Sequence, residues 1–111
     1  MKPKRTTITV FGKIWKVIVL PRKMFNQIPD CDGGTHGITD PDTREIHLCL
    51  ESLNEELVIH ELCHVFFDSV CLSSANLRHK DLEEIAAEMF AKYGKDILKI
   101  SDNLLKELNQ P

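Results

Sequence analysis

Residues 53–70 read LNEELVIHELCHVFFDSV, and this segment sets the expected architecture. Ser52 and Glu55 flank its start with the spacing of a capping box, which predicts that a helix begins there. Apolar residues occur on nearly every side of this helix, a pattern typical of a helix at the centre of a domain. We therefore expect the rest of the chain to pack around it.

The polar exceptions in this helix are His60, Glu61 and His64. Residues i and i+4 lie on the same face of a helix, so the two imidazoles can bind one metal ion. The carboxylate of Glu61, about 100° further round, would lie beside the metal as a base. Buried polar side chains need partners, and a metal ion would supply them. The alternative is a chance match, with all three side chains solvated on a metal-free domain.

A catalytic zinc ion commonly has three protein ligands and one position left for water. Glu84, 20 positions after His64, is the first candidate for the third ligand. Glu88 lies one turn later and could accept the free ring N–H of His60. The rival is His79, 15 positions after His64. The acidic residues also fit a solvated face at the start of a helix, where the helix dipole favours negative charge.

Two β-hairpins precede the central helix. Residues 6–10 and 14–20 are rich in β-branched residues and enclose a turn at Gly12, and residues 35–39 and 45–50 enclose a turn at 40–43. Both faces of strand 14–20 are apolar, so we expect it to be covered on both sides or twisted over a helix. Residues 22–29 allow one helical turn.

Two further helices are expected after the central one, over residues 81–93 and 96–109, with Gly94 as the stop between them. The predicted fold class is α+β, with a small antiparallel or mixed sheet packed on the central helix. We expect a single domain over residues 1–111, in which residues 1–5 form a flexible tail.

Composition limits the classes of function. The chain has 111 residues, 42% of them hydrophobic, and a net charge of −3, so we expect no nucleic-acid partner. No segment reaches the ~20 apolar residues of a membrane span, and no signal peptide is expected. The four cysteines form no Cys-x-x-Cys pair, which favours free thiols in a reducing cytoplasm. Cys63 and Cys71 could be thiolate ligands, but Cys63 lies off the histidine face and is expected to be a small core residue.

His60, Glu61 and His64, with Glu84 20 residues later, resemble the gluzincins, the thermolysin-type zinc peptidases. Within these, the chain looks like the small ImmA/IrrE-type metallopeptidases, which are often encoded by phages and prophages. Residues 37–91 carry the resemblance, through Gly37-Ile38-Thr39-Asp40, Ile46-His47-Leu48 and Glu84-x-x-Ala87-x-x-Phe90-Ala91. Glu88 departs from the pattern, since relatives often carry Asn there. The spacing to His79 also resembles SprT-like proteases, except that Lys80 replaces the usual Gly.

The resemblance implies a minimal zincin-like domain that hydrolyses peptide bonds. Zinc would be held by His60, His64 and Glu84, with Glu61 as general base, and strand 45–50 would be the edge strand that a protein or peptide substrate joins. His36, His79 and Tyr93 are possible oxyanion donors. The protein would act in the cytoplasm, that of the host if it is phage-encoded, and its oligomeric state is left open. The alternatives are a zinc-stabilised regulatory or interaction module and an SprT-like protease with His79 as third ligand.

Overall fold

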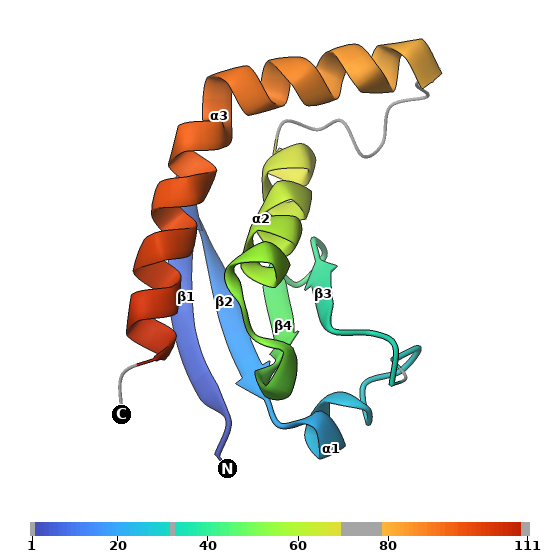
Figure 1. Cartoon of the computed structure of the whole chain (residues 1–111), viewed down its shortest axis with the longest axis vertical. Helices are drawn as coiled ribbons and strands as arrows, with labels where there is room; N and C mark the ends of the chain where they lie inside the picture. Colours follow the sequence, from blue (N-terminus) through green and yellow to red (C-terminus); the bar gives the residue numbers. More distant parts are fainter. Residues whose placement is uncertain (1, 32, 70–78, 110–111) are drawn as a thin grey trace.

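A computed structural model describes residues 2–31, 33–69 and 79–109, with residues 79 and 80 described by their backbone alone. The fold is α+β, as predicted, and is built on one four-stranded sheet (Figure 1). Its strands are β1 (Lys4–Val10), β2 (Lys13–Leu20), β3 (Gly37–Asp40) and β4 (Glu45–Cys49). β1 pairs antiparallel with β2, and β3 pairs antiparallel with β4. β2 and β4 are parallel to each other. Both predicted hairpins and the mixed sheet are therefore confirmed.

The two long helices cover one face of the sheet. The elements are α1 (Arg22–Phe25), the 3₁₀ turn η1 (Leu50–Ser52), α2 (Glu55–Ser69) and α3 (His79–Leu108). In Figure 1, α2 lies over the sheet and the C-terminal half of α3 runs beside β1. The buried core joins alternate strand residues to both helices: Val10, Trp15, Val17, Val19, Ile46, Leu48, Val58, Leu62, Val65, Phe66, Ile97, Leu104 and Leu108. Burial of this apolar surface fixes α2 against the sheet.

The opposite face of the sheet is covered only at one end. Ile14, at the start of β2, is 61% exposed, whereas Ile18 and Phe25 of α1 are buried. The short helix α1, the single turn expected near residue 25, contacts β2 and β4. The expectation that β2 is covered on both sides therefore applies to its C-terminal end alone.

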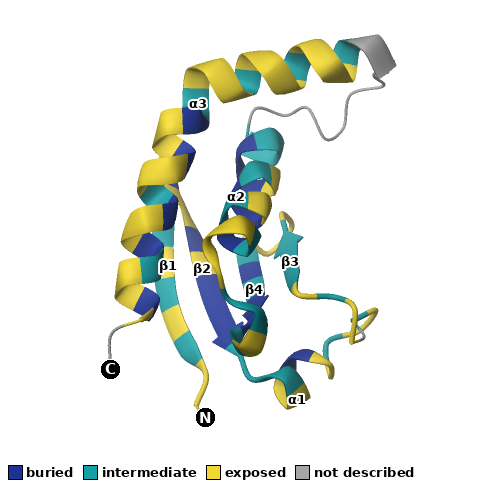
Figure 2. Ribbon diagram, viewed as in Figure 1, coloured by how far each residue is buried: buried dark blue, intermediate teal, exposed yellow. Residues whose placement is uncertain are grey.

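The two helices predicted after α2 are one helix. α3 continues from His79 to Leu108 through Gly94, so the prediction of a stop at that glycine is wrong. A glycine stop needs the left-handed backbone conformation, but Gly12 is the one described glycine with positive φ. Glycine inside a helix costs only about 1 kcal/mol, and the apolar stripe continues past it to Ile97. Figure 2 shows that α3 bends near its middle. The part before the bend is largely exposed, and the part after the bend buries one side.

The sheet order also corrects the expected edge strand. The order is β1-β2-β4-β3, so β4 is an inner strand and β3 is the edge. Neither hairpin alone could reveal this arrangement, because β4 gains its second neighbour from the parallel pairing with β2, which is distant in sequence.

Two boundaries differ from the predictions as well. The side chain of Asn54, not Ser52, caps α2, because its Oδ1 accepts the Leu57 backbone N–H at 2.8 Å. β1 begins at Lys4, whose ammonium group donates to the Leu108 carbonyl, so residues 4 and 5 belong to the sheet and not to a tail.

Among the helices of the described residues, none has the length and apolar character of a membrane span.

Candidate metal centre

Helix α2 presents His60 and His64 side by side on one face. They are four residues apart, and their ring centroids are 5.0 Å apart with an interplanar angle of 73°. Both residues are exposed, so an ion can reach them from solvent. One potential ligand atom from each of His60, Glu61 and His64 lies within 4.8 Å of the others. This group could hold a metal ion.

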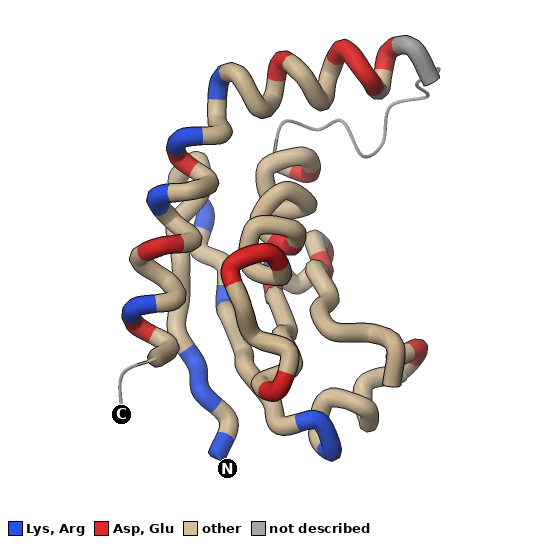
Figure 3. The backbone as a smooth tube through the Cα atoms, in the orientation of Figure 1, with Lys and Arg blue, Asp and Glu red and all other residues tan. Residues whose placement is uncertain are grey.

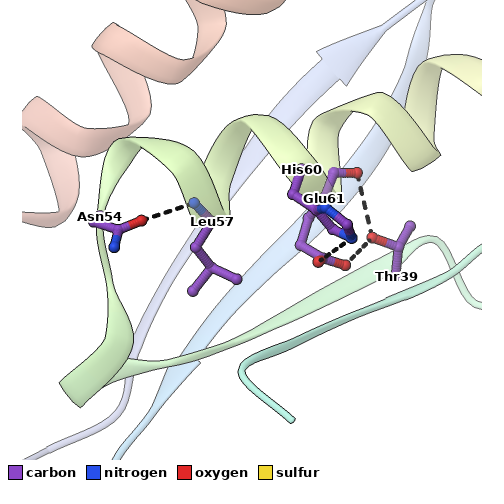
Figure 4. Close-up of polar contacts among 5 residues, drawn as sticks. All are labelled: Thr39, Asn54, Leu57, His60 and Glu61. Carbon is purple, nitrogen blue, oxygen red and sulfur yellow. Dashed lines mark hydrogen bonds and ion pairs between the residues drawn. The ribbon is translucent and has the colours of Figure 1, made fainter. Parts of the chain in front are cut away.

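Glu61 is the buried member of the group, with only 4% of its surface exposed. Its Oε1 accepts a hydrogen bond from Thr39 Oγ1 at 2.8 Å, and its Oε2 lies 3.9 Å from His60 Nε2 (Figure 4). Thr39 Oγ1 is also 3.3 Å from the Glu61 backbone carbonyl. Strand β3 therefore fixes the orientation of the carboxylate, with one oxygen bound by Thr39 and the other turned toward the imidazole.

Gly37, two residues before Thr39 on the same side of β3, allows the strand to approach this carboxylate. A Cβ atom at residue 37 would lie 3.0 Å from the Cγ, Cδ and Oε2 atoms of Glu61. Such a distance is well inside normal van der Waals contact, so any larger residue would displace Glu61 or the strand. The roles of Gly37 and Thr39 were missed from the sequence, although their i, i+2 spacing on a strand indicates a shared face.

His60 and Glu61, but not His64, line a cleft of about 720 Å³ between α2 and the segment that leads into β3. At one end of the cleft lie His60 and Glu61, and at the other lie Ser52 and Asn54. The complete lining is Gly34, Thr35, His36, Gly37, Ser52, Asn54, Glu56, Leu57, His60 and Glu61. A cleft of this size can hold several residues of an extended peptide.

The structure does not bring the predicted third ligand into the group. Glu84 is exposed on α3, in the acidic N-terminal half of that helix seen in Figure 3. Glu88 is also exposed, and it pairs with Lys92 at 3.1 Å rather than with His60. Its hydrogen bond raises the pKa of Lys92. His79 begins α3, but its side chain lies outside the described residues, so its prediction as a ligand stays open.

The remaining candidates lie elsewhere. Tyr93 packs edge-to-face on Phe11, at 5.2 Å between ring centroids, and does not line the cleft. Cys63 is half-buried against the core, and burial raises the pKa of its thiol, which disfavours the thiolate that a metal would need. Cys49 and Cys63 are free thiols, while Cys71 lies outside the described residues.

Comparisons with protein-family models, with curated proteins and with solved structures gave no match for this chain.

Proposed function

We propose that the chain is a zinc-dependent peptidase in which His60 and His64 bind the metal and Glu61 is the general base. The observation that carries this proposal is the buried, Thr39-bound carboxylate of Glu61 beside two exposed imidazoles at the end of an open cleft. A structural glutamate would be expected to form a closed ion pair or to point into solvent. This one has an oxygen 3.9 Å from Nε2 of His60, and ligand atoms of Glu61 and both histidines lie within 4.8 Å of one another.

The donor atoms fit zinc. Two imidazole nitrogens with a nearby carboxylate are the ligand chemistry of catalytic zinc sites, which keep an open position. A bound zinc ion would supply an acidic water molecule and polarise the carbonyl group under attack. We keep Glu84 as the proposed third ligand. It would join the two histidines only if the N-terminal half of α3 lay closer to α2 than it does here.

The contribution of the protein itself is the transfer of one proton by Glu61. Glu61 would remove a proton from the attacking water through the oxygen that Thr39 leaves available, and later deliver that proton to the leaving amine. Burial of Glu61 beside Gly37 keeps bulk water away from one side of the carboxylate. Thr39 holds the carboxylate in place, so little reorganisation is needed during the reaction.

A peptide substrate is proposed because β3 is an edge strand whose first residue, Gly37, lines the cleft. An extended chain could pair with the free edge of β3 and so place a backbone carbonyl near Glu61. This arrangement supports membership of a zincin-like class and the resemblance to small ImmA/IrrE-type peptidases. The substrate would be a protein or peptide; a cytoplasmic and phage-related setting remains part of the proposal.

The test is hydrolysis of a proteome-derived peptide library by the zinc-loaded protein, followed by mass spectrometry. Glu61→Gln should lower the cleavage rate by about 10²–10⁴-fold while zinc content and melting temperature stay close to those of the wild type. Glu56→Gln is the matched control, because Glu56 lines the same cleft but is exposed. Equal cleavage by the wild type and Glu61→Gln would overturn the assignment of the base.

A second candidate function is a zinc-stabilised regulatory or interaction module. It is favoured by the exposure of Glu84, since a site with two histidines and no third protein ligand binds metal without assembling a catalytic centre. Such a module would keep its full function in Glu61→Gln. An SprT-like protease would instead lose zinc in His79→Ala and keep it in Glu84→Ala.

A further inference from the structure

The far end of the cleft holds a second polar cluster, made of Arg22, His36 and Ser52. Nδ1 of His36 lies 2.9 Å from Nη2 of Arg22 and 2.9 Å from the hydroxyl of Ser52. Nη2 of Arg22 also donates to that hydroxyl at 3.1 Å. These contacts join α1 to η1 and to the segment before β3, and the last two of these contribute Ser52 and His36 to the lining of the cleft.

The partners of His36 assign its tautomer. A guanidinium group only donates hydrogen bonds, so Nδ1 must accept from Arg22, and the proton of the neutral ring is on Nε2. The hydroxyl of Ser52 lies 2.9 Å from the same nitrogen and accepts from Arg22. Arg22 is itself held, because Nη1 donates to the Thr35 carbonyl at 2.6 Å and its backbone N–H donates to Glu51 Oε2 at 2.9 Å. The ring of His36 is thereby fixed as a donor of one hydrogen bond from Nε2.

The position of this donor can be compared with that of the proposed base. Gly37, the residue after His36, approaches the Glu61 carboxylate, so His36 lies near the proposed base along the chain. Alternate residues of an extended segment point to opposite sides, and the ring of His36 is held by Arg22 and Ser52. The ring is therefore directed away from Glu61 and toward a neighbouring part of the substrate.

We propose that His36 is a substrate-binding residue that donates its Nε2–H to a main-chain carbonyl of an extended peptide, outside the bond that is cleaved. Arg22 and Ser52 are positioning residues for this donor. The proposal rests on the proposed function, because it takes a peptide as the occupant of the cleft. It also explains why Arg22 is directed onto His36 and not into solvent.

The first experiment measures how the effect of His36 depends on peptide length. A peptide that the wild type cleaves in the library is synthesised and then shortened one residue at a time from each end. His36→Ala should raise KM about tenfold for the full peptide, the loss expected for one hydrogen bond of about 1.4 kcal/mol, with kcat little changed. The difference should fall below about twofold once the residue that His36 binds has been removed from one end. His36→Gln, which keeps an N–H donor, should recover part of the loss.

The second experiment reads the tautomer without any substrate. Imidazole ¹⁵N NMR of the wild type should show a protonated Nε2 and an unprotonated Nδ1 for His36 at neutral pH. Arg22→Gln should produce a mixture of tautomers and part of the KM increase, whereas Lys23→Gln, an exposed neighbour, should do neither. A protonated Nδ1 in the wild type, or an unchanged spectrum in Arg22→Gln, would overturn the positioning role.

A binding measurement separates this proposal from the peptidase assignment. The library is passed over immobilised Glu61→Gln protein and over the same protein carrying His36→Ala. Weaker retention of peptides by the double variant supports the subsite. If the wild type also cleaves nothing, that result overturns the peptidase assignment and leaves the subsite intact. Equal retention by both, including none by either, overturns the subsite. If His36→Ala cleaves the peptide with an unchanged KM, the subsite is overturned and the peptidase assignment remains intact.

Discussion

At the scale of single residues, the site depends on how closely β3 approaches one buried carboxylate. Thr39 donates to Oε1 of Glu61, and Gly37 leaves space that a methyl group would fill at 3.0 Å from the same side chain. These two residues surround the proposed base without touching either histidine in any contact seen here. Substitutions at them should therefore change the chemistry more than they change metal binding.

Thr39→Val keeps the shape of the side chain and removes the hydroxyl that orients Glu61. We expect kcat to fall about tenfold, the free energy of unfolding to fall by about 1 kcal/mol, and zinc content to stay the same. Steady-state kinetics and thermal melts check this. Thr39→Ser is the control that keeps the hydroxyl. If Val and Ser variants were equally active, Thr39 would have no part in orienting the base.

Gly37→Ala should lower kcat by at least about tenfold, because the new methyl group displaces the carboxylate that must face the substrate. Gly33→Ala is the matched control, since a Cβ there meets nothing within 4 Å. Both variants gain the same methyl group, one at the start of β3 and the other in the segment that leads into it. Equal activity of the two variants would show that Glu61 tolerates displacement and is not the base.

At the scale of elements, local patterns predicted the pieces well and their connections less well. Both hairpins and the central helix follow from alternation and periodicity, which depend on nearby residues. The cap at Asn54 is a local contact that the sequence pattern assigned to Ser52 instead. The inner position of β4 and the continuity of α3 depend on contacts between distant segments. Glu84 could be proposed as a ligand from spacing, but whether α3 brings it to His60 depends on packing that spacing does not encode.

Gly94→Ala tests the continuity of α3. In an uninterrupted helix, alanine should stabilise the protein by up to about 1 kcal/mol, since its methyl group makes an ordinary 3.4 Å contact with the ring of Phe90. If Gly94 instead ended a helix in the left-handed conformation, the same change would destabilise the protein by a similar amount. The sign of the change in denaturant midpoint decides between the two.

At the scale of the whole molecule, the arrangement of α3 determines whether the metal has three protein ligands. The C-terminal half of α3 is anchored by Ile97, Leu104 and Leu108 in the core, while Glu84 lies in the exposed N-terminal half (Figures 2 and 3). Metal binding could draw this half toward α2 only if the ligand bond outweighs the cost of bending the helix.

Glu84→Ala should therefore weaken zinc binding by at least about tenfold if Glu84 completes the site. Glu83→Ala is the matched control, an adjacent exposed glutamate on the same turn. Isothermal titration of the metal-free proteins with zinc gives both affinities. Equal affinities for the two variants would remove Glu84 from the ligand set.

The central claim is that His60 and His64 hold a metal ion. Elemental analysis of protein expressed with sufficient zinc measures this most directly, with His60→Ala and His64→Ala as the test variants and His47→Ala, on the other side of the sheet from α2, as the control. We predict about one equivalent of zinc in the wild type and the control, and a melting temperature that falls on chelation, because bound metal stabilises the folded state. Less than about 0.2 equivalents in the wild type, or equal zinc content in all four proteins, would contradict the claim.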